Sequence, residues 1–520
     1  MSLASKVQQH DIVAFLSLPS SWPGAVQVVE THISWVFLTD RYAYKLKKPV
    51  KFDFVDFSTP ERRHQACLDE LQLNRRLAPD VYLDVIPINQ ECNGKLHLGG
   101  GGNEIDSVVQ MKRLPASKAL DRVLKERRLK PSDAQTIVTF LANYYSAQPA
   151  ETLSTDGYRH RLECHIRSNR DELLKSLSDD QVRVRRIHSA QLRYLNVEKD
   201  LLDSRVISGR IVNGHGDLRP EHIYLENPPV VIDCIEFSEE LRKVDIADEL
   251  NFLAMECDRL GKGDLGKLVL STYEDACADE IPAHLGSFYR CYRACVRAKV
   301  AILQAQQQTD DQRRVFNRLT HQYINWADHY ADQLGRPCLL VVFGLMGSGK
   351  STLARKLAEA FDIDIVSTDH IRRSMMGPSP SPAKYGDGLY RADSRRQVYE
   401  ELFCQAGAIL DKGQSLILDG TFLSRELRSR ARDLSRRHGA EVLCILCECS
   451  KETSLARIQL RAEVGRSESE ARADLYEVQV RDFQPPSDET STVRIDTTAH
   501  SVQQLQDVCE ELRKVRGQGI

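Results

Sequence analysis

The sequence predicts an α+β domain with two lobes, followed by an α/β domain built on a parallel sheet. Strand-like alternation over residues 28–57, with further strands up to about residue 114, predicts a β-rich first lobe. A helical, strongly charged pattern from Ala116 to about Leu334 predicts a second, helical lobe. After residue 338 apolar strands alternate with helices, which is typical of a parallel sheet covered on both faces.

The composition is that of an ordinary globular protein. The 520 residues carry 71 Lys+Arg against 74 Asp+Glu, a formal net charge of −3, and 42% are hydrophobic. These values exclude wholesale disorder and do not favour a constitutive binder of nucleic acid or membrane surfaces. We place the domains at 1–335, with a β-rich lobe at about 25–115 and a helical lobe at about 116–335, and at 336–520.

We expect a reduced, cytoplasmic protein. No stretch approaches the roughly 20 apolar residues of a membrane span, and the N-terminus lacks the pattern of a signal peptide. Three of the 14 cysteines cluster in the run VLCILCECS, but a zinc site needs a second, similarly spaced pair. The run instead resembles a buried strand.

The β-rich lobe follows a β-β-α-β-β order. Thr59-Pro60 is a cap and first-turn signal for the helix that follows. Further strands are predicted after this helix, and the glycine run Gly99–Gly102 lies among them. We interpret this run as a hairpin turn rather than a phosphate clamp.

The strongest functional signal is a phosphate-binding loop. The run Gly344-Leu-Met-Gly347-Ser348-Gly349-Lys350-Ser351-Thr352 fits G-x-x-x-x-G-K-[ST], and it lies between an apolar strand and a helix. In such loops the glycines let backbone N–H groups surround a phosphate at the positive end of the helix. Lys350 is then expected to bridge the β- and γ-phosphates, and Ser351 to hold Mg²⁺.

Two downstream strands end in acids. Asp369 and Arg372 follow the second strand, and Asp419 ends the third, where a carboxylate near Mg²⁺ is usual. Asp369 can take the proton of an acceptor hydroxyl while Arg372 holds the acceptor. An alternative is that Asp369 only caps the helix that follows.

An arginine-rich helical segment lies further on. Arg457 and Arg461 can neutralise charge on a triphosphate during transfer, although each can equally be a residue of a solvated face.

On these motifs, residues from 338 to about 500 resemble the small P-loop kinases, especially gluconate-type and polynucleotide-kinase-type phosphotransferases and related AAA-type kinases. The resemblance implies an α/β P-loop kinase domain with a parallel sheet. It also implies ATP and Mg²⁺, with Asp369 as general base and Arg372 on the acceptor.

The first half contains a second phosphoryl-transfer pattern. His215-Gly-Asp217 lies between short strands, and an apolar strand ending in Asp233 follows. Upstream, Lys45 lies on a strand of the β-rich lobe and Glu70 in the next helix, the arrangement that fixes the α- and β-phosphates in eukaryotic-type kinases.

Residues from about 25 to 330 resemble the aminoglycoside phosphotransferase and choline kinase-like family. The resemblance implies a protein-kinase-like, two-lobed fold, with Asp217 as catalytic residue, Asp233 as metal ligand, and Lys45 paired to Glu70 at the phosphates. The family pattern H-x-D-x-x-x-x-N ends in an Asn that binds the second metal ion, whereas this chain has His222 there. Imidazole suits softer ions than Mg²⁺, so Mn²⁺ becomes a candidate at this site. An inactive kinase fold is the alternative.

Helix 289–299 places Arg290, Arg293 and Arg297 on one face. We interpret that face as solvated; the alternative is a grip for an anionic substrate.

Together the motifs predict an ATP-dependent phosphotransferase with two kinase-type modules, acting on a hydroxyl of a small, sugar-like or anionic molecule. Two alternatives remain open. In one, the first half is a non-catalytic module that regulates the P-loop kinase. In the other, the chain is a nucleic-acid 5′-hydroxyl kinase, which the near-neutral charge does not favour.

Overall fold

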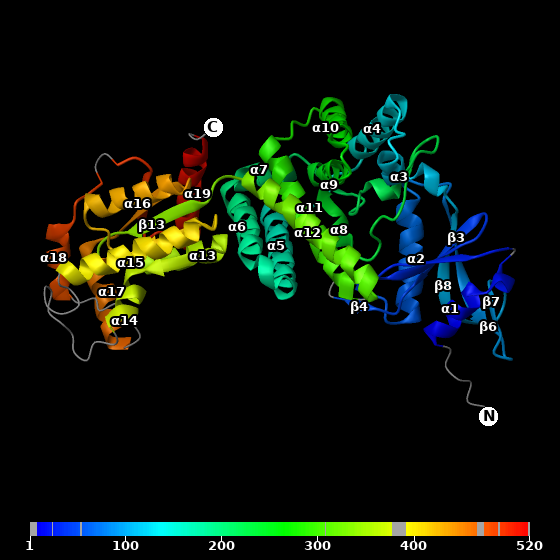
Figure 1. Ribbon diagram of the computed structural model, residues 1–520, viewed down its shortest axis with the longest axis horizontal. Helices are drawn as coiled ribbons and strands as arrows, with labels where there is room; N and C mark the ends of the chain where they lie inside the picture. The colour runs from blue at the N-terminus through cyan, green and yellow to red at the C-terminus, as the bar shows by residue number, and fades with distance from the viewer. Residues whose placement is uncertain are drawn as a thin grey trace. The chain divides into compact units, whose positions relative to one another are not determined.

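The computed structural model describes residues 8–22, 24–52, 55–306, 308–376, 392–464, 473–486 and 489–517 (Figure 1). The chain forms two compact units. The first comprises Met1–Ser154, Arg205–Arg290 and Leu303–Asn317, and the second comprises Thr155–Ser204, Cys291–Ile302 and Arg318–Ile520. Helical residues that precede position 336 are therefore packed with the C-terminal sheet, and the domain boundary at 336 stays a prediction.

The first unit is a mixed α/β structure. Its strands are β1 (Gln27–Glu30), β2 (Ser34–Leu38), β3 (Tyr42–Lys47), β4 (Lys51–Phe52), β5 (Val55–Asp56), β6 (Tyr82–Gln90), β7 (Leu96–Leu98), β8 (Asn103–Lys112), β9 (Ile211–Asn213), β10 (Ile223–Tyr224), β11 (Val230–Val231) and β12 (Lys243–Asp245). Its helices are α1 (Gln9–Ser17), α2 (Pro60–Asn74), α3 (Leu120–Lys125), α4 (Pro131–Ser146), α8 (Glu239–Arg242), α9 (Ile246–Arg259) and α10 (Gly263–Cys277). Three helices contribute to both units: α7 (Lys199–Ile207), α11 (Ala283–Gln306) and α12 (Asp310–Asp332).

An antiparallel sheet of six strands, in the order β1-β2-β3-β8-β6-β7, forms the predicted β-rich lobe. Helix α2 begins as its cap signal predicts, because the Thr59 hydroxyl accepts the Arg62 N–H and Pro60 takes the first turn. The prediction of a hairpin turn at Gly99–Gly102 is wrong. Strands β7 and β8 pair with opposite edges of β6, so these glycines carry the chain from one edge to the other, and the β6–β7 turn lies at Glu91–Lys95.

The second unit contains a five-stranded parallel sheet in the order β14-β15-β13-β16-β17. Its strands are β13 (Cys338–Phe343), β14 (Asp364–Ser367), β15 (Leu416–Asp419), β16 (Glu441–Glu448) and β17 (Thr492–Asp496). Its helices are α5 (Thr155–Ser176), α6 (Gln181–Val197), α13 (Lys350–Phe361), α14 (Thr368–Met376), α15 (Ala392–Leu410), α16 (Arg425–Arg437), α17 (Lys451–Val464), α18 (Ala473–Asp482) and α19 (Ser501–Gly517). The sequence predicted the first four strands; the fifth, β17, was not predicted.

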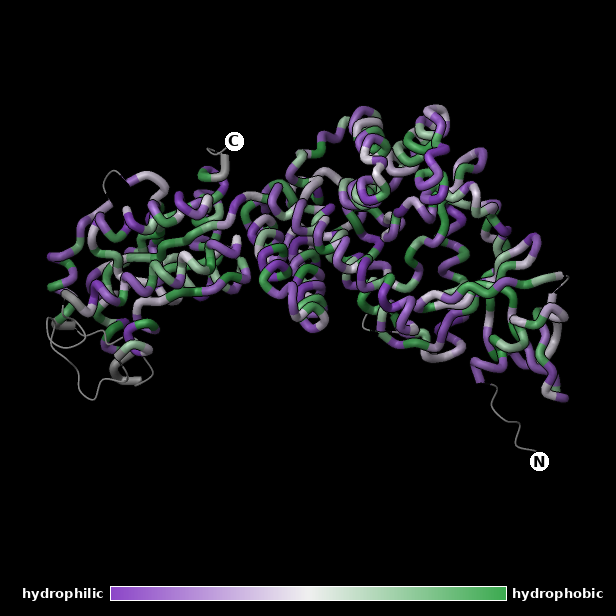
Figure 2. Tube along the Cα trace, viewed as in Figure 1, coloured by the Kyte–Doolittle hydropathy of each residue, from purple (hydrophilic) through white to green (hydrophobic). Residues whose placement is uncertain are grey.

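Alternate residues of β13 face two separate cores. Leu339, Val341 and Phe343 pack with residues of α14, α15 and α16, whereas Leu340 and Val342 pack with α13 and α19. Strand β13 is uniformly apolar and buried as a result, and this part of the sheet appears hydrophobic in Figure 2. The prediction of a parallel sheet covered on both faces is confirmed.

Helix α6 also joins the second of these cores. Val197 packs there, Asn196 donates to the Ala360 carbonyl at the end of α13 (3.3 Å), and Arg193 donates to the Gly335 carbonyl (3.0 Å). These contacts explain why residues 155–204 belong to the second unit.

The arginines of α11 are not a solvated face, contrary to our interpretation. Arg293 is buried and lies over the Tyr292 ring, and Arg290 forms an ion pair with Asp258 (3.1 Å). Arg297 lies over the Tyr323 ring. The helix is packed on several sides, so its long cationic side chains find partners inside the protein. None of the described helices is both long enough and apolar enough to cross a membrane.

A fully buried arginine links the loop after β15 to the segment before β17. Arg428 donates to both carboxylate oxygens of Glu489 (2.7 and 3.0 Å) and to the carbonyls of Phe422 and Gln484 (2.7 Å each). A buried charge is tolerated only when it is paired in this way.

We expect Arg428→Ala to lower the free energy of unfolding of the second unit by about 3–5 kcal/mol, because Glu489 would be left as a buried, poorly compensated charge. The matched control is Arg425→Ala, whose side chain is 60% exposed and lies 3.7 Å from the same carboxylate. It should cost less than about 1 kcal/mol. Urea denaturation followed by circular dichroism measures both, and equal effects would contradict this account.

Candidate functional site

The phosphate-binding loop lies between β13 and α13, and its glycines are required by close packing. Gly344, Gly347 and Gly349 have φ of 139°, 76° and 90°. A Cβ at Gly344 would lie 2.5 Å from the Cys447 carbonyl, and one at Gly347 would lie 2.5 Å from the Ser454 carbonyl. The loop can therefore take this shape only with glycine at these positions.

Two polar groups in the loop suit a phosphate. The Ser348 hydroxyl is buried and has no hydrogen-bond partner among the residues that the structure describes. Lys350, at the start of α13, donates to the Leu345 carbonyl (2.7 Å) and so lies back across the loop. A buried hydroxyl without a partner is costly unless a ligand satisfies it, and a phosphate oxygen would do so.

Strand register brings the two predicted acids to the same edge of the sheet. Asp419 is opposite Val342 of β13 on one side and Ser367 of β14 on the other. Burial raises the pKa of Asp419, and a hydrogen bond from Ser351 opposes that rise. A serine hydroxyl beside a carboxylate is a hard oxygen donor set, and it fits Mg²⁺.

Asp369 and Arg372 form an ion pair on α14 (2.7 Å). The helix begins at Thr368, and the Ser367 hydroxyl accepts the Asp369 N–H (3.2 Å), so Ser367 caps the helix. The alternative of Asp369 as the cap is therefore wrong. Its carboxylate is 30% exposed, so it remains accessible.

Arg457 reaches the phosphate-binding loop from α17. It donates to the Thr497 hydroxyl (2.9 Å) and carbonyl (3.0 Å), and it lies 3.5 Å from the Gly347 carbonyl. The solvated-face alternative is therefore wrong for this residue. The side chain of Arg461 lies outside the described residues, as do all residues from 465 to 472.

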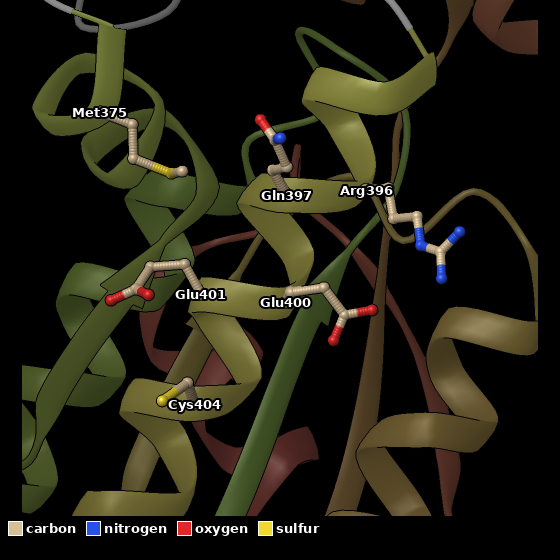
Figure 3. A pocket seen from close by; sticks show the side chains of 6 residues that line it. All are labelled: Met375, Arg396, Gln397, Glu400, Glu401 and Cys404. Atoms are coloured by element: carbon tan, nitrogen blue, oxygen red, sulfur yellow. The ribbon is translucent and has the colours of Figure 1, made fainter.

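A surface pocket of about 920 Å³ lies beside α15 (Figure 3). Its lining consists of Met375, Arg396, Gln397, Glu400, Glu401 and Cys404. Tyr399, in contrast, is buried and its hydroxyl accepts the Phe422 N–H (3.0 Å). The pocket therefore belongs to a different face of α15 from the one that contacts the loop after Asp419.

In the first unit, Lys45 lies at the centre of a cluster of paired charges. Its ammonium pairs with Glu70 of α2 (2.8 Å) and with Asp233 (2.5 Å). Burial alone would lower the pKa of Lys45, but Asp233 and Glu70 outweigh it and hold the pKa well above its usual value. Burial would raise the pKa of Asp233, yet the ammonium of Lys45 holds it well below the ordinary range. The three groups thus keep one another ionised.

Asp217 lies in the turn after β9. Its carboxylate accepts from Arg219 (2.8 Å), and its backbone carbonyl lies 2.9 Å from Nδ1 of His222. Nε2 of His222 lies 3.1 Å from Arg219 and 3.5 Å from Asp233. Asp217, His222 and Asp233 thus lie together as predicted, whereas Arg219 was not foreseen. Among the described residues no group of three or more His, Cys, Asp or Glu side chains is arranged to hold a metal ion.

Sequence reasoning also missed a second buried lysine. Lys47 is two residues after Lys45 on β3, is fully buried, and pairs with Glu70 and Glu236. Lys47 therefore binds one carboxylate oxygen of Glu70 while Lys45 binds the other. The spacing of two on one strand, which places both lysines on the same face, was the available signal.

The turn that carries Asp217 is held by Glu249 of α9. The buried carboxylate accepts the N–H groups of His215 (2.6 Å) and Gly216 (2.8 Å) and the hydroxyl of Tyr145 (2.8 Å). Nothing in the local sequence marks this residue, because its contacts are more than 30 positions away.

Comparisons with known proteins agree with this geometry. The pattern of a family described as "AAA domain" matches residues 339–486, the segment that holds the phosphate-binding loop and both acids. The sheet order, the loop and the acids define this half as a kinase-like P-loop domain.

Other relatives match most of the chain. Proteins described as uncharacterized from Mycobacterium bovis and Mycobacterium tuberculosis are 32% identical over 446 residues, 84% of this chain and 86% of each relative. The chain belongs to the family of these mycobacterial proteins.

Shorter similarities concern the second half. A shikimate kinase of Novosphingobium aromaticivorans is 38% identical over 73 residues, 14% of this chain and 37% of that enzyme. A solved gluconokinase of Sinorhizobium meliloti is 18% identical, with a TM-score of 0.27, and the match covers 35% of this chain and 95% of that one.

We expect Glu249→Gln to speed hydrogen–deuterium exchange at His215 and Gly216, because the amide oxygen replaces only one of two charged acceptors. Each hydrogen bond to a charged group contributes about 1.5–3 kcal/mol. Tyr145→Phe, which removes a bond to the same carboxylate but leaves both backbone bonds, is the control. Unchanged exchange in Glu249→Gln would show that the carboxylate does not hold the turn.

Proposed function

We propose that the chain is an ATP-dependent phosphotransferase whose second half transfers the γ-phosphoryl group to a hydroxyl of a small molecule. One observation carries this proposal: the phosphate-binding loop, the Ser351–Asp419 pair and the Asp369–Arg372 pair lie at the same edge of one parallel sheet. Phosphoryl transfer needs little beyond positioning and charge stabilisation, and these groups supply both.

Each group has a distinct role in the proposal. Gly347, Ser348, Gly349 and Lys350 bind the β- and γ-phosphates, with Gly344 and Thr352 at the ends of the loop. Mg²⁺, held by Ser351 and Asp419, neutralises charge on the phosphates when it is bound.

The reaction itself uses the pair on α14. Asp369 takes the proton of the acceptor hydroxyl, and the oxygen of that hydroxyl forms a bond to the γ-phosphorus. The bond between the γ-phosphorus and the bridging oxygen of the β-phosphate breaks, and ADP leaves. Arg372 orients the acceptor, which suits a sugar-like or anionic molecule. Arg457 and Arg461 lie on α17, from which they would neutralise the triphosphate.

For the first half we propose a second, protein-kinase-like module, as the aminoglycoside phosphotransferase resemblance implies. The paired Lys45, Glu70 and Asp233 support it, with Asp217 beside them. Lys45, oriented by Glu70, would hold the α- and β-phosphates. Asp233 would hold a divalent cation, with Mn²⁺ as an alternative to Mg²⁺. Regulation by a non-catalytic first half is the second candidate, favoured by His222 at the position of the usual Asn.

A nucleic-acid acceptor is not part of the proposal. Within the arginine-rich segment 425–437, Arg428 is fully buried, and both Arg428 and Arg432 pair with Glu489. These side chains are engaged in the fold rather than offered to a phosphate backbone.

We expect Asp369→Asn to lower kcat of the second half by about 10²–10⁴, the usual contribution of a general base. Nucleotide affinity should stay within about threefold, because Asp369 acts on the acceptor. Asp364→Asn, at the exposed opposite end of β14, is the matched control and should leave kcat unchanged. A screen of metabolites for ³²P transfer from ATP supplies the acceptor. Equal kcat in Asp369→Asn and wild type would refute the assignment.

We expect Asp217→Asn in a Lys350→Ala background to remove the remaining phosphoryl transfer while ATP binding to the first half persists. Asp217 would orient the acceptor, whereas Lys45 would bind phosphate. If the Lys350→Ala variant with Asp217 intact binds ATP but transfers no phosphoryl group, the first half is a regulatory module rather than a catalytic one. Lys45→Ala is the control, and it should weaken binding itself.

A further inference from the structure

Arg219 is a buried cation in the middle of the first unit's site. Its side chain is 10% exposed and is surrounded by the carboxylates of Asp217 and Glu221, to both of which it donates. Its Nε has no hydrogen-bond partner among the described residues. A buried guanidinium with a donor to spare is suited to an oxygen-rich anion.

The ring of His222 is oriented toward this arginine. A backbone carbonyl can only accept, so the 2.9 Å contact between Nδ1 and the Asp217 carbonyl assigns the ring proton to Nδ1. Nε2 then carries the lone pair. It lies 3.1 Å from Nη2 of Arg219, which is a donor, and 3.5 Å from the carboxylate of Asp233. The lone pair is thus engaged by a cation of the protein.

These contacts do not fit a second divalent cation at His222. A metal ion on Nε2 would compete with the guanidinium for one lone pair and would be repelled by it. One oxygen of Asp217 accepts from the same Nη2 atom (2.8 Å), and one oxygen of Asp233 pairs with Lys45 (2.5 Å). The half-exposed carboxylate of Asp233 remains the better place for a single ion.

We propose that the guanidinium of Arg219 takes the place of the second divalent cation in the first unit's site, where it binds the terminal phosphates of the nucleotide, and that His222 positions it. This inference rests on the proposed nucleotide site of the first half. It assigns to His222 a positioning role in place of metal ligation, and it makes one divalent cation per nucleotide sufficient there.

The test counts metal ions in the full chain carrying Lys350→Ala and Ser351→Ala, which weaken the phosphate-binding loop of the second unit. Electron paramagnetic resonance measures Mn²⁺ bound in the presence of a non-hydrolysable ATP analogue, and calorimetry gives the affinity for the analogue. We expect one Mn²⁺ per analogue bound. Adding Arg219→Met should weaken analogue binding at least tenfold, with partial recovery in Arg219→Lys.

The double variant Arg219→Met/His222→Asn should bind a second Mn²⁺, because it removes the competing cation and supplies an amide oxygen. Arg128→Met, at an exposed arginine of the same unit, is the control for loss of a positive charge. Circular dichroism checks that each variant is folded.

The outcomes separate the two claims. Two Mn²⁺ per analogue with Arg219 and His222 intact, or unchanged affinity in Arg219→Met, would overturn the inference and leave the nucleotide site standing. An absence of analogue binding with any cation would overturn the nucleotide site of the first half, and this inference with it.

Discussion

The parallel register of β13, β14 and β15 is the constraint on which the second unit's site depends. Because these strands run in the same direction, their carboxyl ends meet at one edge, and the phosphate-binding loop, Asp369 and Asp419 follow from three different strands. Neighbouring backbone then limits the loop itself. The Cys447 and Ser454 carbonyls approach so closely that only glycine fits at Gly344 and Gly347. Packing and phosphate binding thus require the same residues.

The first unit uses a different principle, which is the pairing of buried charges. Lys45 and Lys47 share Glu70, and each has a further acid, Asp233 or Glu236. Removing any one partner would leave an uncompensated charge in a medium where that is costly. The network therefore fixes the geometry of Lys45 before any ligand arrives. A lysine fixed in this way suits both candidate functions of the first half, which are phosphoryl transfer and regulation by nucleotide binding. The two differ only in whether Asp217 acts on an acceptor.

Local patterns predicted much of this structure. The phosphate-binding loop and four strands of the parallel sheet were visible because each is encoded within about ten residues, and the spacing of Lys45 and Glu70 predicted their contact. Contacts between distant segments were not visible. Glu249 acts through His215, Gly216 and Tyr145, which only the fold brings near it. The contacts of Arg219, in contrast, lie within three residues of it in the sequence, but no pattern assigned it a role. Strand β17 (TVRID) has no continuous apolar run that would mark it. The glycines at 99–102 carried a turn signal, but a turn signal does not say which strands pair.

The central claim is that one chain holds two separate nucleotide sites, and the stoichiometry of nucleotide binding tests it most directly. Calorimetric titration of the full chain with a non-hydrolysable ATP analogue and Mg²⁺ should reveal two sites. Lys350→Ala should abolish or strongly weaken one of them, and Lys45→Ala the other. A single site that survives Lys45→Ala unchanged would contradict the account of the first unit, and no binding at all would contradict the whole account.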